Sequence, residues 1–244
     1  MNKDRFIPAD MTGLSALESI RSAGRLNAWI FGMIRPYMGG RILEVGSGIG
    51  NISSQFVRHG LSLTLSDYSD EYCGYLRKKF SSEPLVRTVI KINLADANFE
   101  RTHARWLGSF DTVFALNVVE HIRDDRLAIA NCHRLLAQGG QLILLMPAYQ
   151  FLYNRYDKQL GHYRRYSRRS MESLLSTKFG VVRTWYYNLG GIFGWFVFGT
   201  VFRGKHIREW QMSAYDKLVG LFQLADRVTF NRVGLSILGV GKKE

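Results

Sequence analysis

The sequence predicts an α/β fold in which a parallel sheet of seven strands carries helices on both faces. Three observations support this fold. Short apolar segments alternate with amphipathic helical patterns. The first apolar segment is followed by a glycine-rich loop. Two strand-like segments near the C-terminus bring the number of expected strands to seven. The composition suits a folded globular chain, because 46% of the 244 residues are hydrophobic and 22% are charged. Disordered, collagen-like and coiled-coil proteins are therefore excluded.

The elements follow one another in a regular order. An amphipathic helix is expected over 14–38, where apolar residues recur at helical spacing before Gly39 and Gly40 end it. Strands and helices then alternate, which implies right-handed crossovers. The expected strands are 41–45, 63–67, 86–93, 110–116, 141–147, 181–187 and 235–240. The expected helices between them are 50–59, 69–80, 124–137, 167–179 and 211–226.

The glycine loop after the first strand favours a cationic cofactor that carries a ribose. Gly46, Gly48 and Gly50 let the backbone turn tightly and let a ligand approach the main chain. Glu44 stands two places before the first glycine, where a carboxylate would repel phosphate. Asp67 ends the second strand, where a carboxylate can accept both ribose hydroxyls. A dinucleotide-binding loop is poorly supported, because it needs its third glycine one place later.

The segment from Ile42 to Gly50, taken with Asp67, resembles motif I and the acidic loop of class I S-adenosylmethionine-dependent methyltransferases. The resemblance continues through 93–96, 117–122, 135–140, 160–166 and 234–237. The last two segments resemble a bacterial subgroup that is sometimes fused to family 2 glycosyltransferases. The family implies a Rossmann-like, mostly parallel sheet whose last strand is antiparallel, an N-terminal helix, and a C-terminal helical and apolar insertion. It also implies S-adenosylmethionine as the cofactor.

The resemblance implies one methyltransferase domain over 1–244. We expect an N-terminal helical segment over 1–39, a cofactor-binding core over 40–147, and an acceptor-binding or lid region over 148–244. The lid region contains an apolar insertion over 185–230.

The family also implies the residues that hold the cofactor. The three glycines of the loop would bring the backbone against the methionine part, with Glu44 at its ammonium end. Asp67 would bind the ribose diol, and Tyr68 would lie against the adenine.

Three further positions complete the expected cofactor site. Asp96 resembles the acid that accepts the adenine amino group, and the Ala97 amide would lie beside it. Asn117 would line the cofactor through its backbone. Asp96 has an alternative role as a helix cap just before Asn98.

His121 and His162 are the candidate catalytic residues, since a hydroxyl acceptor must lose a proton to a base. His121 follows the fourth strand, at the sheet edge where open α/β folds bind ligands. The alternative is that it only orients its loop. Glu120 and His121 could together contribute to a divalent-metal site, but two adjacent residues provide too few ligands. No metal site is therefore predicted.

Arg164, Arg165 and Tyr166 are the candidate acceptor-binding residues, because guanidinium groups beside a pocket suit an anionic group. A solvated or salt-bridged face is the alternative for the two arginines.

The basic charge is concentrated late in the chain. The formal net charge is +13, and 16 basic residues face only 6 acidic ones after position 150. The insertion also holds a 14-residue apolar segment, 189–202, followed by Arg203, Lys205 and Arg208. That segment is too short to span a bilayer. Aromatic residues beside basic ones suit an anionic membrane surface or a lipid-linked acceptor, and a packed helical lid is the alternative.

These observations favour an enzyme that methylates a small hydrophobic or lipid-linked acceptor, on oxygen rather than nitrogen or carbon. An RNA methyltransferase and a non-catalytic cofactor-binding module are the alternatives, but no recognisable RNA-binding module is present, so nucleic acid is disfavoured. Cys73 and Cys132 are far apart in the sequence, which argues against a disulfide scaffold. We expect a cytoplasmic protein, with a peripheral location at the inner face of the membrane kept open.

Overall fold

One seven-stranded sheet organises the chain in the computed structural model, which describes residues 11–196 and 209–244. The strands are Ile42–Val45 (β1), Leu63–Asp67 (β2), Val86–Lys91 (β3), Phe110–Leu116 (β4), Leu136–Pro147 (β5), Gly180–Tyr187 (β6) and Ser236–Lys242 (β7). Their order across the sheet is β3-β2-β1-β4-β5-β7-β6. β1 to β5 pair in parallel, and β7 pairs antiparallel with both β5 and β6. The expected topology, including the antiparallel last strand, is confirmed.

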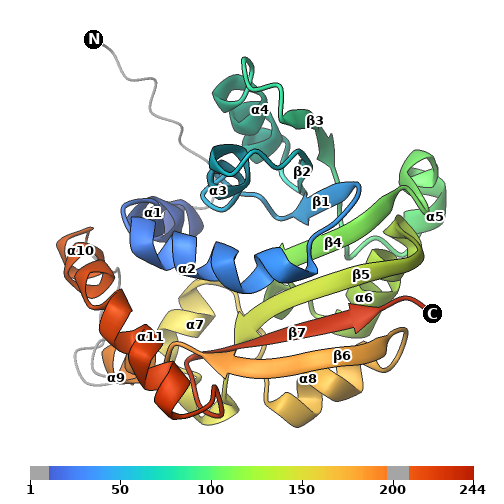
Figure 1. Cartoon of the computed structure of the whole chain (residues 1–244). Coiled ribbons are helices and arrows are strands. Elements are labelled where there is room, and N and C mark those ends of the chain that lie inside the picture. The colour runs from blue at the N-terminus through green and yellow to red at the C-terminus, as the bar shows by residue number, and fades with distance from the viewer. Residues whose placement is uncertain (1–10, 197–208) are drawn as a thin grey trace.

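Helices cover both faces of this sheet (Figure 1). Gly24–Ile34 (α2), Ser53–Arg58 (α3) and Asp70–Lys79 (α4) contribute apolar side chains to one core cluster. Asp125–Leu135 (α6) and Arg168–Leu175 (α8) contribute to the cluster on the other face, beside the short helix Phe99–Thr102 (α5). The central strands β1, β2 and β4 are nearly inaccessible, as expected for a sheet covered on both faces, whereas the edge strands β3 and β6 have exposed residues.

The N-terminal helix expected over 14–38 is two helices. Met11–Arg21 (α1) ends and α2 begins at Gly24, with a turn at Ser22 and Ala23. The Asn27 amide donates to the Ile20 carbonyl at 2.9 Å, which satisfies the end of α1 and fixes the turn. A short 3₁₀ turn, Arg35–Tyr37, completes the segment. Apolar periodicity persists through such a turn, which is why the sequence pattern did not show it.

The C-terminal insertion is also divided more finely than expected. It contains Leu189–Phe196 (α9), Glu209–Lys217 (α10) and Val219–Val228 (α11), so the single helix expected over 211–226 is interrupted at Leu218. A short helix, Arg155–Gln159 (α7), precedes α8. Figure 1 shows α10 and α11 beside α1 and α2, at the end of the sheet where the parallel strands finish. Phe198, Phe202, Arg203, Lys205 and Arg208 lie outside the described residues.

The carboxyl end of the sheet is where backbone strain concentrates. Asn117, Tyr149 and Asn188 each have a positive φ, of 54°, 62° and 70°. They follow the ends of β4, β5 and β6. Residues other than glycine rarely adopt this conformation, and such strain is common at ligand sites. This edge is therefore the expected place of a ligand site.

Candidate functional site

The glycine loop that follows β1 has no room for side chains. Gly46, Gly48 and Gly50 have φ values of 73°, 53° and 73°. A Cβ atom on Gly46 would lie 2.4 Å from Val118 in the loop after β4, and one on Gly48 would lie 2.9 Å from Leu17 of α1. The loop is thus held between two other segments, and its backbone conformation requires glycine.

Glu44 is a buried carboxylate behind this loop. It lies in the middle of β1, where the Ser53 hydroxyl donates a hydrogen bond to it. Burial raises the pKa of Glu44 to about 7. Lys79 of α4 binds the glycine loop through two hydrogen bonds. Its ammonium donates to the Ile49 carbonyl at 2.7 Å and to the Gly50 carbonyl at 3.1 Å. A cation placed near Glu44 would favour the ionised carboxylate.

Asp67 ends β2 beside the glycine loop. Its carboxylate accepts from the Gly48 amide and the Ser69 amide, both at 3.0 Å. Burial raises the pKa of Asp67, and these amides oppose the shift. Tyr68, the next residue, is 66% exposed, so its ring faces outward from the same edge. The structure therefore brings Asp67, the residue predicted to bind the ribose, together with the glycine loop.

Asp96 has local partners in the loop after β3. Its carboxylate accepts from the Asn98 amide at 2.7 Å, and a hydrogen bond with Thr102 is the largest cause of a lowered pKa at Asp96. Ala97 is exposed beside it. The N-cap of α5 is Asn98, so Asp96 forms a local turn with the Asn98 amide and does not cap the helix. Adenine binding by Asp96 stays a prediction.

Asn117 stands directly after β4 and is exposed at the sheet edge. Its backbone amide donates to the Leu145 carbonyl at 2.8 Å, which fixes the strained position. Asn117 therefore lies at the same carboxyl edge as Asp67, as expected.

The two candidate catalytic histidines come together from different loops. His121 belongs to the 3₁₀ turn Val119–His121 after β4, and His162 belongs to the loop after α7. Their ring centroids are 4.6 Å apart with the planes nearly perpendicular. His121 is exposed, whereas the His162 side chain is only 8% exposed. The sequence could not show this contact, because 40 residues separate them.

Asp157 orients His162 and was not predicted. Asp157 is fully buried, and its Oδ1 lies 2.9 Å from His162 Nδ1 and 2.9 Å from Arg165 Nε. Its Oδ2 accepts from the Asn154 amide at 2.9 Å in a helix capping box. Because a carboxylate only accepts, Nδ1 of His162 carries the proton and Nε2 is left as the basic nitrogen. The Asn154-x-x-Asp157 spacing was the one signal that could have indicated this residue.

Glu120 is the most unusual group near the histidines. It is fully buried, and neither carboxylate oxygen has a hydrogen-bond partner among the described residues. Burial raises the pKa of Glu120 to about 8. A buried polar group without a partner is costly, so such groups commonly indicate a function.

The three residues predicted to bind the acceptor have protein partners. Arg164 forms an ion pair with Asp125 at 2.8 Å, and the Tyr166 hydroxyl donates to the same carboxylate at 3.0 Å. Arg165 is buried, donates to the Ala148 carbonyl at 3.1 Å, and its guanidinium lies 4.4 Å from the Trp195 ring centroid. The salt-bridged arrangement weighed for the arginines is thus present. Acceptor binding by these residues stays a prediction.

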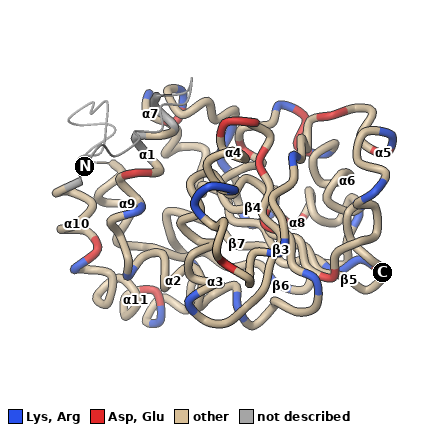
Figure 2. Tube along the Cα trace, turned by 90° about the horizontal axis from the view of Figure 1, so that it is seen from above, with Lys and Arg blue, Asp and Glu red and all other residues tan. Residues whose placement is uncertain are grey.

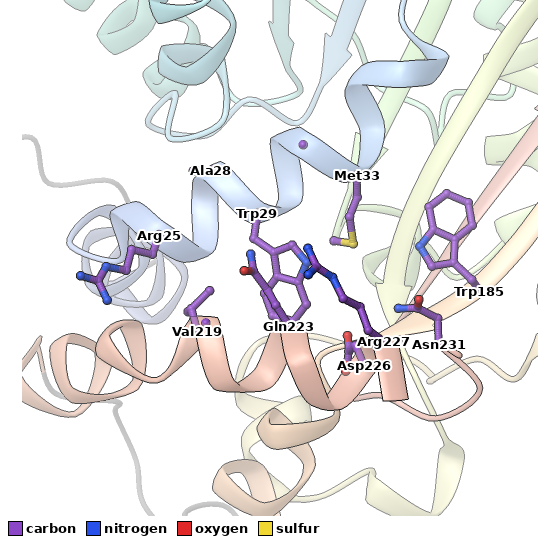
Figure 3. A pocket seen from close by; sticks show the side chains of 12 residues that line it. Arg25, Ala28, Trp29, Met33, Trp185, Val219, Gln223, Asp226, Arg227 and Asn231 are labelled. Carbon is purple, nitrogen blue, oxygen red and sulfur yellow. The ribbon is translucent and has the colours of Figure 1, made fainter. Parts of the chain in front are cut away.

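A cavity of about 600 Å³ lies between α2 and α11 (Figure 3). Trp29 and Met33 face it from α2, Trp185 from β6, and Gln223 and Arg227 from α11. None of the predicted cofactor or catalytic residues lines it. The cavity is therefore separate from the edge that carries Asp67 and the histidines.

Two apolar surfaces are exposed in the C-terminal part. The α9 groove combines Phe151, Phe193 and Phe196 with Leu152, Leu189 and Ile192. Phe151 is 80% exposed and Phe193 is 76% exposed. The α11 stripe consists of Leu218, Leu221, Leu224 and Val228, all exposed at roughly helical spacing. Exposed apolar patches of this kind mark protein, ligand or membrane contacts.

Comparison with known proteins points to one enzyme class. Residues 43–144 match a family model described as a methyltransferase domain. The chain is 31% identical over 109 residues to the ubiquinone biosynthesis O-methyltransferase of Caulobacter sp. (strain K31), covering 45% of this chain and 41% of that protein. It is 29% identical over 125 residues to the S-adenosyl-L-methionine-dependent Diels-Alderase of Talaromyces variabilis, covering 51% and 42%. The matches span less than half the length of these curated relatives.

Solved structures share the fold. Haemonchus contortus phosphoethanolamine N-methyltransferase 2, in complex with phosphomonomethylethanolamine and S-adenosylhomocysteine, superposes with a TM-score of 0.59 at 20% identity. The superposition covers 89% of this chain and 52% of that one. At this identity the likeness shows the arrangement of the sheet and its helices alone.

Proposed function

Because this chain carries the methyltransferase domain of the class I S-adenosylmethionine-dependent enzymes, we propose that it transfers the cofactor's methyl group to an oxygen of a small hydrophobic or lipid-linked acceptor. The acceptor oxygen attacks the methyl carbon, the carbon–sulfur bond breaks, and S-adenosylhomocysteine leaves. Because the sulfonium is a good leaving group, holding the two reactants in line supplies much of the acceleration.

The observation that carries the proposal is the histidine pair at the edge that also holds the predicted cofactor residues. His121 follows Asn117 by four residues, so the pair lies beside the end of β4. A hydroxyl acceptor must lose its proton as the new bond forms, and His162 offers a basic Nε2 held in position by Asp157. An amine acceptor would not need this group in the same way. The O-methyltransferase among the relatives supports the same choice.

The exposed apolar surfaces support a hydrophobic acceptor that is reached at a membrane surface. The α9 groove lies close to the histidine loop, because Trp195 of α9 donates to the Leu152 carbonyl and stacks on Arg165. Basic and acidic positions lie side by side in α10 and α11 (Figure 2), where Lys217 follows Asp216 and Arg227 follows Asp226. Within residues 11–196 and 209–244, no helix has the length and hydropathy needed to cross a bilayer. We therefore propose peripheral contact through α9 and α11.

The decisive experiment supplies the purified chain with labelled S-adenosylmethionine and a lipid extract of the native host. We expect a labelled lipid-soluble product whose mass has grown by one methylene unit and whose new group is a methyl ether or ester. His162→Ala should abolish most of this turnover, while the affinity for S-adenosylhomocysteine stays within about twofold. His133→Ala is the matched control, because His133 lies at the far end of α6 and should leave turnover unchanged.

Three results would contradict the proposal. Label on RNA would indicate a nucleic-acid enzyme, and a methylated amine would replace the oxygen acceptor. Cofactor binding without any methylated product in lipid or aqueous extracts would indicate a non-methylating use of the fold.

A further inference from the structure

The cavity between α2 and α11 combines aromatic side chains with a guanidinium group (Figure 3). Its volume of about 600 Å³ is in the usual range for sites that hold small organic ligands. Trp29 and Met33 of α2 and Trp185 of β6 supply the apolar part of the lining, and Arg227 of α11 faces them. Indole rings and a thioether both make favourable contacts with another aromatic ring. This lining therefore suits a ligand with an aromatic body.

Arg227 supplies a positive charge to the cavity. Its guanidinium has no hydrogen bond or ion pair within residues 11–196 and 209–244. Asp226 lines the same cavity, but its carboxylate already accepts from the Asn188 amide at 2.6 Å and from the Leu189 amide at 2.8 Å. A guanidinium binds carboxylate and phosphate groups well, because it offers several donors in one plane. An anionic group on the ligand would therefore bind to Arg227.

Trp185 provides a second, independent observation. The side chain is buried, with 7% of the residue exposed, and its indole nitrogen is turned toward the cavity (Figure 3). That N–H has no hydrogen-bond acceptor in the described part of the chain, and neither do the side-chain amides of Gln223 and Asn231, which line the same space. A buried tryptophan N–H usually finds an acceptor. A ligand with acceptor oxygens would supply it.

Two glycines leave the cavity free of side chains at its walls. Gly32 lies in the last turn of α2 and Gly220 in the first turn of α11, and both line the cavity. A Cβ atom at either position would meet no described atom within 4 Å, so close packing of the helices does not require glycine there. Glycine is also a poor helix former. Side chains introduced at these positions would occupy the space that a ligand needs.

We propose that this cavity binds an aromatic organic anion, either an aryl carboxylate or an aryl phosphate. The ring would lie among Trp29, Met33 and Trp185, and the anionic group would bind Arg227 and the Trp185 N–H. None of the predicted cofactor or catalytic residues lines the cavity, so this site is separate from the one proposed for methyl transfer. The inference therefore does not rest on the proposed function.

Isothermal titration calorimetry of the purified full chain tests the site with 2-naphthoate and with 2-naphthyl phosphate. We expect saturable binding of one probe molecule per chain, and the probe that binds more tightly identifies the preferred anionic group. 2-Naphthol has the same ring without the charge, so it should bind at least about tenfold more weakly. Inorganic phosphate alone should give no measurable heat, because it lacks the aromatic body.

Substitutions locate the bound probe. Arg227→Gln should weaken binding by at least about tenfold, and Gly220→Leu should abolish it by filling the cavity. Arg126→Gln and Gly74→Leu are the matched controls, because both residues are exposed on helices that do not line the cavity, α6 and α4. A Cβ atom on Gly74 also meets no described atom within 4 Å. His162→Ala should bind the probe as the wild type does.

Circular dichroism is measured on every variant, and Gly32→Leu replaces Gly220→Leu as the filling variant if the latter misfolds. Failure of the wild type to bind either probe would overturn the proposal. Binding that Arg227→Gln and the filling variant leave unchanged would also overturn it, since the probe would then lie elsewhere, as in the α9 groove. Loss of binding in His162→Ala would place the probe at the histidine edge and contradict a separate site.

Discussion

Glu44 is a buried carboxylate whose ionisation should make both stability and the predicted cofactor binding depend on pH. Burial raises its pKa to about 7, whereas an exposed glutamate titrates near 4.5. In the unliganded protein the folded state therefore keeps a proton that the unfolded chain has already released. Since the folded state binds more protons over this interval, stability should fall as the pH rises from 4.5 to about 7.

The cofactor should reverse this preference, because its ammonium and sulfonium groups favour the ionised form of Glu44. We expect the affinity for S-adenosylmethionine to rise with pH up to about 7 and then to level off. Calorimetry in buffers of different ionisation enthalpy should count about one proton released per cofactor at the low end of this range. Glu44→Gln should bind more weakly and without this slope. A wild-type affinity that stayed constant across this interval would place the cation elsewhere.

The proposed membrane contact through α9 can be tested by substituting its exposed phenylalanines. A phenylalanine that moves from water into the bilayer contributes about 1.5–3 kcal/mol. The double substitution Phe193→Ser and Phe196→Ser should therefore weaken co-sedimentation with anionic liposomes by at least about tenfold. Wild-type binding should decrease with salt without vanishing, since salt screens only the charge contribution.

Val182→Ser is the control, because Val182 is an exposed apolar residue on β6, outside the α9 groove. It should leave liposome binding unchanged. If the wild type fails to co-sediment even at low salt, the exposed surfaces of α9 and α11 face a protein partner or a soluble acceptor.

The sheet could be predicted from the sequence because its signals are local. Most of the strands are apolar segments bounded by glycine or polar residues, and the observed strands overlap all seven expected ones. β5 begins at Leu136, earlier than expected, because the chain passes straight from α6 into the strand. The breaks before Gly24 and at Leu218 were missed, since apolar periodicity carries across a short turn.

The candidate site was only half predictable for a related reason. The glycine loop and Asp67 lie in motifs that can be read along the chain, and the fold brings them together as expected. Asp157 and the burial of Glu120 depend on contacts between loops that are far apart in sequence. Such contacts leave no periodic or spacing signal. The ion pairs of Arg164 with Asp125 and of Arg165 with Asp157 could not be predicted for the same reason.

Across the whole molecule, Asp216 connects α10, near the C-terminus, to α2, near the N-terminus. α2 begins without a side-chain cap of its own, and the Asp216 carboxylate on α10 accepts from the Leu26 amide at 2.8 Å and the Arg25 amide at 3.2 Å. A residue about 190 positions away thus caps this helix. Its negative charge also suits the positive end of the helix.

Asp216→Ala should lower the free energy of unfolding by about 1 kcal/mol, the typical value for losing a helix cap. Asp216→Asn should lose less, because an amide oxygen can still accept. Chemical denaturation followed by circular dichroism measures both differences. Equal stability of wild type and Asp216→Ala would mean that solvent caps α2 equally well. Glu100→Ala is the control, because that carboxylate pairs with Arg134 on the far side of the sheet.

The packing of α1 on the glycine loop has a consequence for how the cofactor exchanges. Leu17 fills the space above Gly48, its carbonyl accepts from the Asn51 amide at 2.9 Å, and Leu14 packs with Ile49 and Tyr72. The first helix thus rests on the loop that would hold the methionine part of the cofactor. If cofactor binding favours the docked position of α1, docking of α1 must raise the affinity for the cofactor by the same factor. A bound cofactor would therefore slow proteolytic cleavage within α1.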